Sequence, residues 1–506
     1  MQEHLIKVHP SSDRLAREDQ FAWKLAAFAT SRPPINDDVA EMISCRLVDN
    51  ASVALVSLNR SSVANALRMA LTHPRAGGAS LFGLAPETTV HAEWAAWANG
   101  TAVRELDFHD TYLAADYAHP GDSIPPLVAV AQQCGRSGAD LVRAIAVAYE
   151  VHVQLVRRIC LHEYKKDHSA HLIAAQTAGL GALLDLPTEI VYQAINQAVH
   201  IGFSSRQSRK GEISSWKAYV PGHSGKLAVE AIDRAMRGEG APNPIYEGED
   251  SVIAWMLGGP EAEYRVLLPE AGEAPKGILE TYTKAHSAEY QAQALIDLAL
   301  EMGEGLDTSQ IKDITLHTSE HTHTVIGTGA NDPQKSDPKA SRETLDHSIT
   351  YILAVALEDL RWHHVDSYTR ERASRPATVK LWHSIPTVED PVWSERYHAT
   401  DPAEQAFGGR LEITLEDGTV LSGEKAAANA HPNSGQGWAW SDYLQKFDAL
   451  TGDLINAGER DRFVAGVERV GALSADEVKR INPVLPPDAG IAGAAPSTGI
   501  FDWPLS

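Results

Sequence analysis

The spacing of hydrophobic residues in the first half of the chain predicts one helix after another. Between Asp37 and Leu58, apolar residues recur with the spacing of the buried face of a helix. The same spacing predicts helices over 62–72, 92–99, 139–161, 171–184 and 187–201. Gly135 follows another expected helix, over 125–134, and glycine is typical of a helix C-terminus. Few stretches in this half alternate as a half-buried strand does.

The pattern changes near residue 277. Helices are expected over 287–302 and 346–360, and residues 311–318 alternate like a strand. Alternating runs over 410–415 and 420–425 flank Asp417-Gly418, which predicts a hairpin. Helices return over 441–450 and 459–470, and the Ser474–Glu477 stretch has the pattern of a capping box. We therefore predict a mostly α fold. Its large helical domain combines residues 1–276 and 428–506, and a smaller α+β domain, 277–427, is inserted between them.

Composition narrows the class of protein. A chain of 506 residues with 43% hydrophobic content is expected to be globular and to have more than one domain. A net charge of −23 argues against nucleic acid or an anionic membrane as partner. No apolar signal segment or membrane span is recognised, so the cytoplasm is the expected location. The three cysteines are scattered, which favours neither a disulfide framework nor an iron–sulfur cluster.

One short stretch, 106–126, concentrates reactive side chains. It holds four aspartates and two histidines. A helical turn over 107–111 would place Asp107 and Thr111 on one side. His119 precedes a proline and is expected in an extended loop, where an imidazole could act as acid or base. Asp122 or Ser123 could cap the helix that follows. The alternative, that the aspartates only cap helices and the histidines are solvated, stays open.

Two segments are locally basic in this acidic chain, 157–171 and 204–226. They contain His168, Arg209, Lys210 and Lys217, which could hold a small anion, or could simply balance surface charge. Residues 281–291 and 346–351 place Lys284, His286, Tyr290 and Tyr351 near the starts of two helices, where caps and core tyrosines are the plainer interpretation. The histidine clusters match no metal-binding pattern and no GxGxxG or P-loop occurs, so neither a metal nor a cofactor is predicted.

Several of these motifs together resemble the MmgE/PrpD family. They are NGTAVRELDFHDTYLAADYAHPGDSIPP (99–126), KKDHSAHLIAA, SSWKAYVPGHSGKLAVEAI, TYTKAHSAEYQ and LDHSITYILAVAL, in the family's order. The first of these, together with the block 208–259, is similar to the members that dehydrate 2-methylcitrate. The resemblance implies a helical domain, a smaller α+β lid with the active site between them, and a homodimer.

The resemblance also implies a chemistry. The expected reaction is a cofactor-independent dehydration of 2-methylcitrate, a small tricarboxylate, to 2-methyl-cis-aconitate in propionate catabolism, with citrate as a possible second substrate. By position, the active-site residues would be Asp107, Thr111, His119, His168, Lys217 and Tyr351, with Lys284, His286 and Tyr290 facing the site from the lid. His119 and His168 would transfer protons, Asp107 would orient an imidazole or act as partner base, and Tyr351 would donate a hydrogen bond. Lys217, Arg209 and Lys210 would bind carboxylates.

Two features depart from the family pattern, and two other functions remain open. His109 stands where aspartate or asparagine is more usual, and Glu289-Tyr290-Gln291 departs from versions that carry a histidine near position 291. Within the family, the chain could instead be a cis-aconitate decarboxylase or another small polycarboxylate lyase or isomerase. Outside it, the chain could be a non-catalytic helical scaffold that keeps these motifs as relics.

Overall fold

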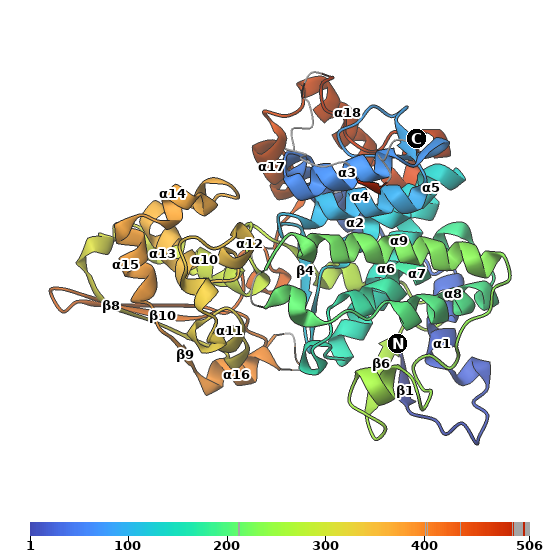
Figure 1. Ribbon diagram of the computed structural model, residues 1–506, viewed down its shortest axis with the longest axis horizontal. Coiled ribbons are helices and arrows are strands. Elements are labelled where there is room, and N and C mark those ends of the chain that lie inside the picture. The colour runs from blue at the N-terminus through green and yellow to red at the C-terminus, as the bar shows by residue number, and fades with distance from the viewer. Residues whose placement is uncertain are drawn as a thin grey trace.

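The computed structural model describes residues 1–506 except 211–212, 400, 402, 436, 488, 490–498 and 501–506. The prediction of a mostly helical chain is confirmed. Figure 1 shows a large helical body on one side and a smaller unit of helices and strands on the other. Among the described residues, no helix is long and apolar enough to cross a membrane.

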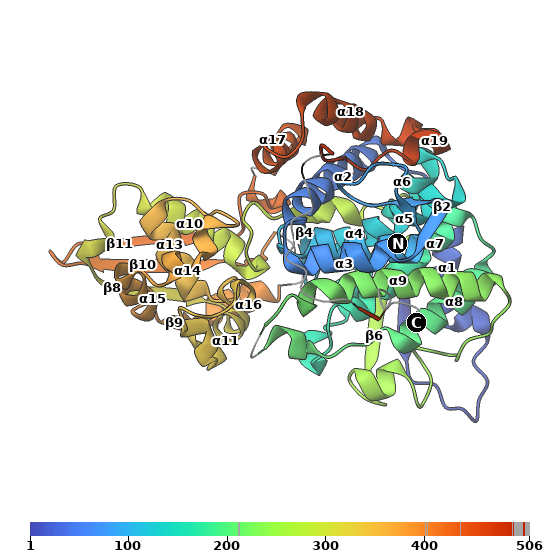
Figure 2. The same ribbon diagram turned by 45° about the horizontal axis from the view of Figure 1, so that its top comes forward.

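The helical body joins segments from both ends of the chain. Its helices are α1 (Phe21–Thr30), α2 (Asp37–Ser57), α3 (Ser61–Leu71), α4 (Ala92–Arg104), α5 (Ile124–Cys134), α6 (Gly138–Arg158), α7 (Ser169–Leu184), α8 (Thr188–Ile201), α9 (Trp216–Met236), α17 (Trp440–Thr451), α18 (Ala457–Glu468) and α19 (Ala475–Val478). One core contains Val48 of α2, Leu127 of α5, Phe447 of α17 and Phe463 of α18, all buried. The C-terminal helices therefore close over the same core as the first half (Figure 2).

Short strands border this body. They are β1 (Gln2–Lys7) paired with β6 (Glu263–Leu268), β2 (Pro74–Ser80) paired with β3 (Thr89–Val90), and β4 (Asp110–Leu113) between β5 (Tyr117–Ala118) and β7 (Tyr282–Thr283). All three sheets are antiparallel. The hydrophobic pattern did not reveal these strands. β3, β5 and β7 have only two residues each, and the pairs β1–β6 and β4–β7 join segments far apart in the sequence.

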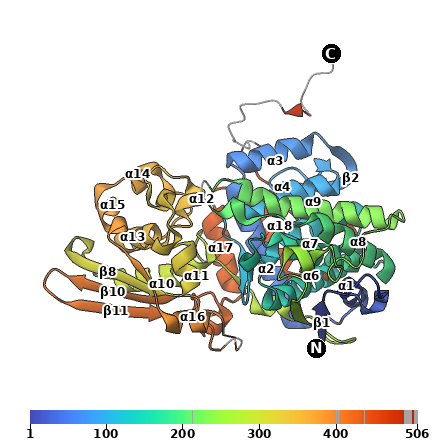
Figure 3. The same cartoon turned by 60° about the horizontal axis from the view of Figure 1, so that its bottom comes forward.

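The smaller unit, which we call the α+β unit, has its own core. Its elements are α10 (Gln293–Gly303), β8 (Ile311–Thr318), α11 (Glu320–Val325), α12 (Arg342–Leu345), α13 (Ile349–Asp359), α14 (Arg370–Ala373), α15 (Pro376–His383), β9 (Thr387–Glu389), α16 (Pro391–Tyr397), β10 (Gly409–Leu415) and β11 (Val420–Lys425). The sheet order is β11-β10-β8-β9, with β8 and β9 parallel. Ile314 and Ile413 are paired on neighbouring strands and pack in one core with Ile296 of α10 and Ile352 of α13. Figure 3 shows these helices beside the sheet. The domain boundaries at 276/277 and 427/428 stay predictions.

Three local predictions are wrong, all near the motifs. Residues 107–111 do not form a helical turn. Asp107 adopts a left-handed conformation with φ 51°, and β4 begins at Asp110 and pairs with β5 and β7. Ser123 stands at the N-cap of α5, but neither its side chain nor that of Asp122 forms a capping hydrogen bond. Helices α10 and α13 begin later than their hydrophobic spacing suggests, because the residues before them form turns.

Candidate active site

His119 is held on a tight turn directly after β5. Its Nδ1 lies 2.9 Å from the backbone oxygen of Asp110. A carbonyl oxygen only accepts, so Nδ1 carries the hydrogen, and Nε2 of the neutral ring keeps its lone pair. No residue in the described part of the chain forms a hydrogen bond with Nε2. Burial, followed by the positive charges of Arg104 and Lys284, lowers the pKa of His119 well below its ordinary value.

The turn needs a glycine after Pro120. The amide of Gly121 donates to Oδ1 of Asp110 at 2.8 Å, and its carbonyl accepts from Asn50. A Cβ atom at Gly121 would lie 2.7 Å from that same Oδ1. The motif therefore places His119 by allowing a close approach of the backbone to a buried carboxylate.

His168 precedes α7 and faces His119. The ring centroids are 5.4 Å apart and the rings are nearly perpendicular. Nδ1 of His168 lies 3.1 Å from Oδ1 of Asp167, and Nε2 lies 3.6 Å from Oδ2 of Asp122. Burial alone would lower the pKa of His168, but Asp167 and Asp122 outweigh it, so the pKa is raised. The two neighbouring imidazoles therefore favour opposite states, His119 neutral and His168 protonated.

Three cationic side chains surround the carboxylate of Asp107. Its buried carboxylate lies 2.6 Å from Nη1 of Arg104 and 3.6 Å from Nζ of Lys217, and it pairs with Nζ of Lys284. Burial would raise the pKa of Asp107, but Arg104, Lys284 and Lys217 lower it well below its ordinary value. Among the described residues, Asp107 forms ion pairs with cations and no hydrogen bond or ion pair with an imidazole, although its charge acts on His119. Its predicted role as the group that orients a histidine has no support in these contacts.

The α+β unit contributes the second carboxylate. Nζ of Lys217 lies 2.6 Å from Oδ2 of Asp346, and Nη1 of Arg342 lies 3.3 Å from the same oxygen. The other oxygen of Asp346 pairs with His347. Lys217 of α9 thus contacts both Asp107 of the helical body and Asp346 of the α+β unit. The charged cluster therefore lies where these two units meet.

The remaining predicted residues are more dispersed. Arg209 ends the short 3₁₀ turn Arg206–Arg209, its Nε is 3.3 Å from Asp167, and its Nη2 is buried without a hydrogen-bond partner in the described part of the chain. Lys210 is exposed. The hydroxyl of Thr111 donates to the carbonyl of Ala118.

Three other residues predicted for the site, His286, Tyr290 and Tyr351, form their polar contacts with residues of the α+β unit. His286 contacts Asp297 at 2.8 Å, and the hydroxyl of Tyr290 lies 3.0 Å from Nε2 of His321. Tyr351 lies in the core of the unit, where its ring packs on Trp382 and its hydroxyl donates to the backbone of Ser367 at 2.5 Å. The structure does not bring Tyr351 together with the two histidines.

Other residues belong to the cluster although sequence reasoning gave them no role. Arg104, His109, Asp122, Asp167 and Asp346 lie inside the recognised motifs, and Arg342 lies three residues before the last of them. His109 was set aside because the resemblance favours another residue there. Only the fold shows that its ring lies 5.4 Å from that of His119.

One group of side chains has the composition of a metal site. Among the described residues, the potential ligand atoms of Asp116, Cys160 and His162 lie within 4.8 Å of one another. Asp116 already accepts from the amide of Leu161 at 2.8 Å and contacts Nδ1 of His162 at 2.7 Å. These contacts explain the grouping as the support of a loop, and the expectation of no bound metal stays a prediction.

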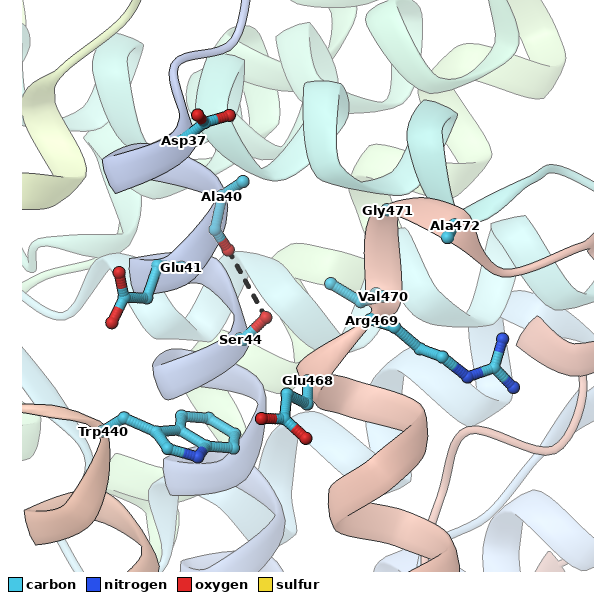
Figure 4. Close-up of a pocket in the computed structure, with 10 residues that line it drawn as sticks. All are labelled: Asp37, Ala40, Glu41, Ser44, Trp440, Glu468, Arg469, Val470, Gly471 and Ala472. Carbon is cyan, nitrogen blue, oxygen red and sulfur yellow. Dashed lines mark hydrogen bonds between the residues drawn. The ribbon is translucent and has the colours of Figure 1, made fainter.

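A surface pocket of about 420 Å³ lies elsewhere, between α2 and the C-terminal helices (Figure 4). Asp37, Glu41, Glu468, Arg469 and Trp440 are among its lining residues. None of the predicted site residues lines it, so it is separate from the histidine cluster.

The sequence is similar to known proteins over most of its length. Residues 19–265 match the MmgE/PrpD N-terminal domain, and residues 286–470 match the MmgE/PrpD C-terminal domain. A mitochondrial 2-methylcitrate dehydratase of Yarrowia lipolytica is 30% identical over 339 residues, which are 64% of this chain and 63% of that protein. 2-Methylcitrate dehydratases of Cupriavidus necator and Escherichia coli K12 are 28% and 25% identical, over 65% and 64% of this chain and 68% of each relative. The match thus spans a little less than two thirds of the Yarrowia protein. Two family models together cover most of the sequence, and this chain belongs to the MmgE/PrpD family.

Proposed function

We propose that this chain is a cofactor-independent hydro-lyase that dehydrates 2-methylcitrate to 2-methyl-cis-aconitate. The observation that carries the proposal is the pair of buried imidazoles, 5.4 Å apart and favouring opposite protonation states, beside a group of buried cations. Relatives that bear the name 2-methylcitrate dehydratase support the choice of substrate. Citrate, which lacks one methyl group, is a second substrate, because one methyl changes binding by only about 1–3 kcal/mol.

The cations suit a tricarboxylate. Arg104, Lys217, Lys284, Arg342 and Arg209 are all at least half buried, in a chain whose net charge is −23. Without substrate, aspartates of the protein neutralise them, chiefly Asp107 and Asp346. Substrate carboxylates would take over part of this pairing, and charge-assisted hydrogen bonds from lysine and arginine would then orient the substrate.

The reaction needs a base and an acid on the two sides of the bond that forms. Nε2 of neutral His119 takes the proton from the carbon next to the tertiary alcohol, and that C–H electron pair becomes the new double bond. His168 gives its proton to the departing hydroxyl, which leaves as water. The cations stabilise the negative charge that develops on the adjacent carboxylate in the transition state. The carbonyl of Asp110 fixes the tautomer of His119 that this step requires.

The state of His168 before the reaction supports its role as the acid. Its Nε2 is 3.6 Å from Asp122, too far for a hydrogen bond, so the proton there is held by charge alone. Asp167, 3.1 Å from the other nitrogen, raises the pKa of the ring and so favours its protonated form. The pKa of His168 is raised and that of the neighbouring His119 is lowered. Acid–base catalysis uses such pairs, in which one group gives a proton and the other takes one.

The test is direct. Chelator-treated protein is mixed with 2-methylcitrate, and the conjugated double bond of the product is followed by ultraviolet absorbance. We expect absorbance to rise and no carbon dioxide to be released. Carbon dioxide release from cis-aconitate would instead favour the decarboxylase, and no reaction with either compound would favour the scaffold.

A further inference from the structure

A third imidazole, that of His109, lies close to the two imidazoles of the proposed reaction and has no part in it. Its ring centroid is 5.4 Å from that of His119. His109 directly precedes β4 and is fully buried, with an exposed fraction of 0%. Neither ring nitrogen has a hydrogen-bond partner in the described part of the chain. Its Nε2 nevertheless lies 2.9 Å from Oδ1 of Asp122, which is an ion-pair distance, although the direction is not that of a hydrogen bond.

Asp122 lies between two imidazoles. Oδ1 faces Nε2 of His109 at 2.9 Å, and Oδ2 faces Nε2 of His168 at 3.6 Å. Its side chain is fully buried, and neither oxygen forms a well-aligned hydrogen bond within the described residues. Burial would raise the pKa of Asp122, but His109, His168 and Arg104 outweigh burial and lower the pKa below its ordinary value. These neighbours therefore stabilise a carboxylate that has no well-aligned hydrogen bond of its own among the described residues.

The backbone keeps Asp122 in this place. Its amide donates to the carbonyl of His119 at 3.1 Å, and its carbonyl accepts from Gln176 at 3.0 Å. Asp122 is therefore on the same tight turn as His119, and its backbone is held there by contacts other than those with the two imidazoles it faces.

We propose that Asp122 is a positioning residue whose negative charge is divided between His168 and His109, so that His109 limits how firmly His168 holds its proton. While His109 shares the charge, His168 keeps its proton mainly through Asp167. When His109 is replaced by a neutral residue, the whole charge of Asp122 acts on His168, and the proton is harder to release. The inference rests on the proposed function only for the role of His168 as the acid.

Other charged groups also face these residues, and the test leaves them unchanged. The groups that face His168 besides Asp122 are Asp167, Arg209, His119, His152 and His171, and Arg104 faces Asp122. Because they are the same in every variant, differences between variants report on His109 and Asp122.

Three variants test the proposal: His109→Asn, Asp122→Asn and the double variant. The first readout is the alkaline limb of the kcat/KM profile, where activity falls as His168 loses its proton. We expect His109→Asn to move this limb to higher pH and Asp122→Asn to move it to lower pH, each by about one pH unit. The double variant should behave as Asp122→Asn does, because in this proposal His109 acts on His168 through that carboxylate.

The second readout separates this proposal from the proposed function. The titration of His168 is followed in the free protein by NMR of ¹³Cε1-labelled histidine, with the signal assigned from a His168→Gln variant. The same opposite shifts are expected there, even if 2-methylcitrate is not turned over. His431→Asn is the matched control, because His431 is also buried but faces neither Asp122 nor His168, and it should leave the titration unchanged.

Three outcomes would overturn the proposal. They are a titration of His168 that His109→Asn leaves in place or lowers, shifts that simply add in the double variant, and an Asp122→Asn variant that titrates as the parent does. The last can be measured even if His109→Asn does not fold, so the proposal remains open to refutation in that case.

Discussion

Replacing Asp107 by asparagine should strongly destabilise the protein. The side chain is 3% exposed and faces Arg104, Lys217 and Lys284. Asparagine keeps the size of the side chain and tolerates the φ of 51° at this position, so the loss of charge is the main change. Removing one partner of a buried ion pair leaves the other charged and unpaired, and typically costs about 3–5 kcal/mol. We expect a loss of this size at pH 7.

The pH dependence of that loss follows from the lowered pKa of the Asp107 carboxyl. The three cations lower the pKa of Asp107 in the folded protein well below its ordinary value, against the opposite effect of burial. A lowered folded pKa stabilises the protein above the unfolded pKa of about 3.9, and this stability is lost as pH falls toward the folded value. The difference between parent and variant should therefore be full at pH 7 and shrink below about pH 4.

The assay is urea unfolding of parent and variant at pH 7 and at several lower pH values. Asp448→Asn is the matched control, because Asp448 pairs with Arg460 at 2.6 Å on the surface and is 45% exposed. Exposed pairs contribute at most about 1 kcal/mol, so the control should unfold nearly as the parent does. A loss below about 1 kcal/mol for Asp107→Asn would refute the view that this carboxylate neutralises the cations.

Three further predictions concern single residues. Because the pKa of His119 is lowered well below its ordinary value, the acid limb of kcat/KM should lie below about pH 6.5, and a limb above that value would contradict a neutral His119. Tyr351→Phe should leave kcat/KM within about twofold of the parent and cost about 1 kcal/mol in urea unfolding, the contribution of one hydrogen bond; a large loss of kcat with unchanged stability would restore Tyr351 to the site. Gly121→Ala should cost about 1–3 kcal/mol, because the added methyl meets Oδ1 of Asp110 at 2.7 Å, and a variant as stable as the parent would show that the turn has more room.

The hydrophobic pattern was sufficient to predict the long helices and strands, but it did not predict which side chains meet at the site. Residues 311–318 alternate in sequence and form β8 with those bounds, and the Ser474–Glu477 capping box is present. Both signals are local. Asp107 was expected in a helical turn, but its carboxylate pairs with Lys284 and Lys217, which follow more than a hundred residues later. Such contacts leave no trace in local periodicity.

The motifs identified most of the site residues, but they did not identify the residues that these side chains contact. The resemblance identified His119, His168, Lys217 and Lys284, which the structure brings together. It also suggested Tyr351, whose spacing from His347 fits one helix face equally well whether that face lines a site or a core. The ring packs on Trp382 in the core. His109 and Asp122 were passed over because a contact between two buried side chains, both within one motif, becomes visible only after β4 and the following turn fold back on each other.

The central claim is that His119 is the base in a buried polycarboxylate site. The most direct test is the turnover of 2-methylcitrate by the parent and by His119→Asn, with citrate binding measured on both by calorimetry. Asparagine can still donate to the carbonyl of Asp110, as Nδ1 does, but it has no basic nitrogen. We predict that kcat falls by about 10²–10⁴-fold while citrate still binds. Turnover within about tenfold of the parent would contradict the assignment.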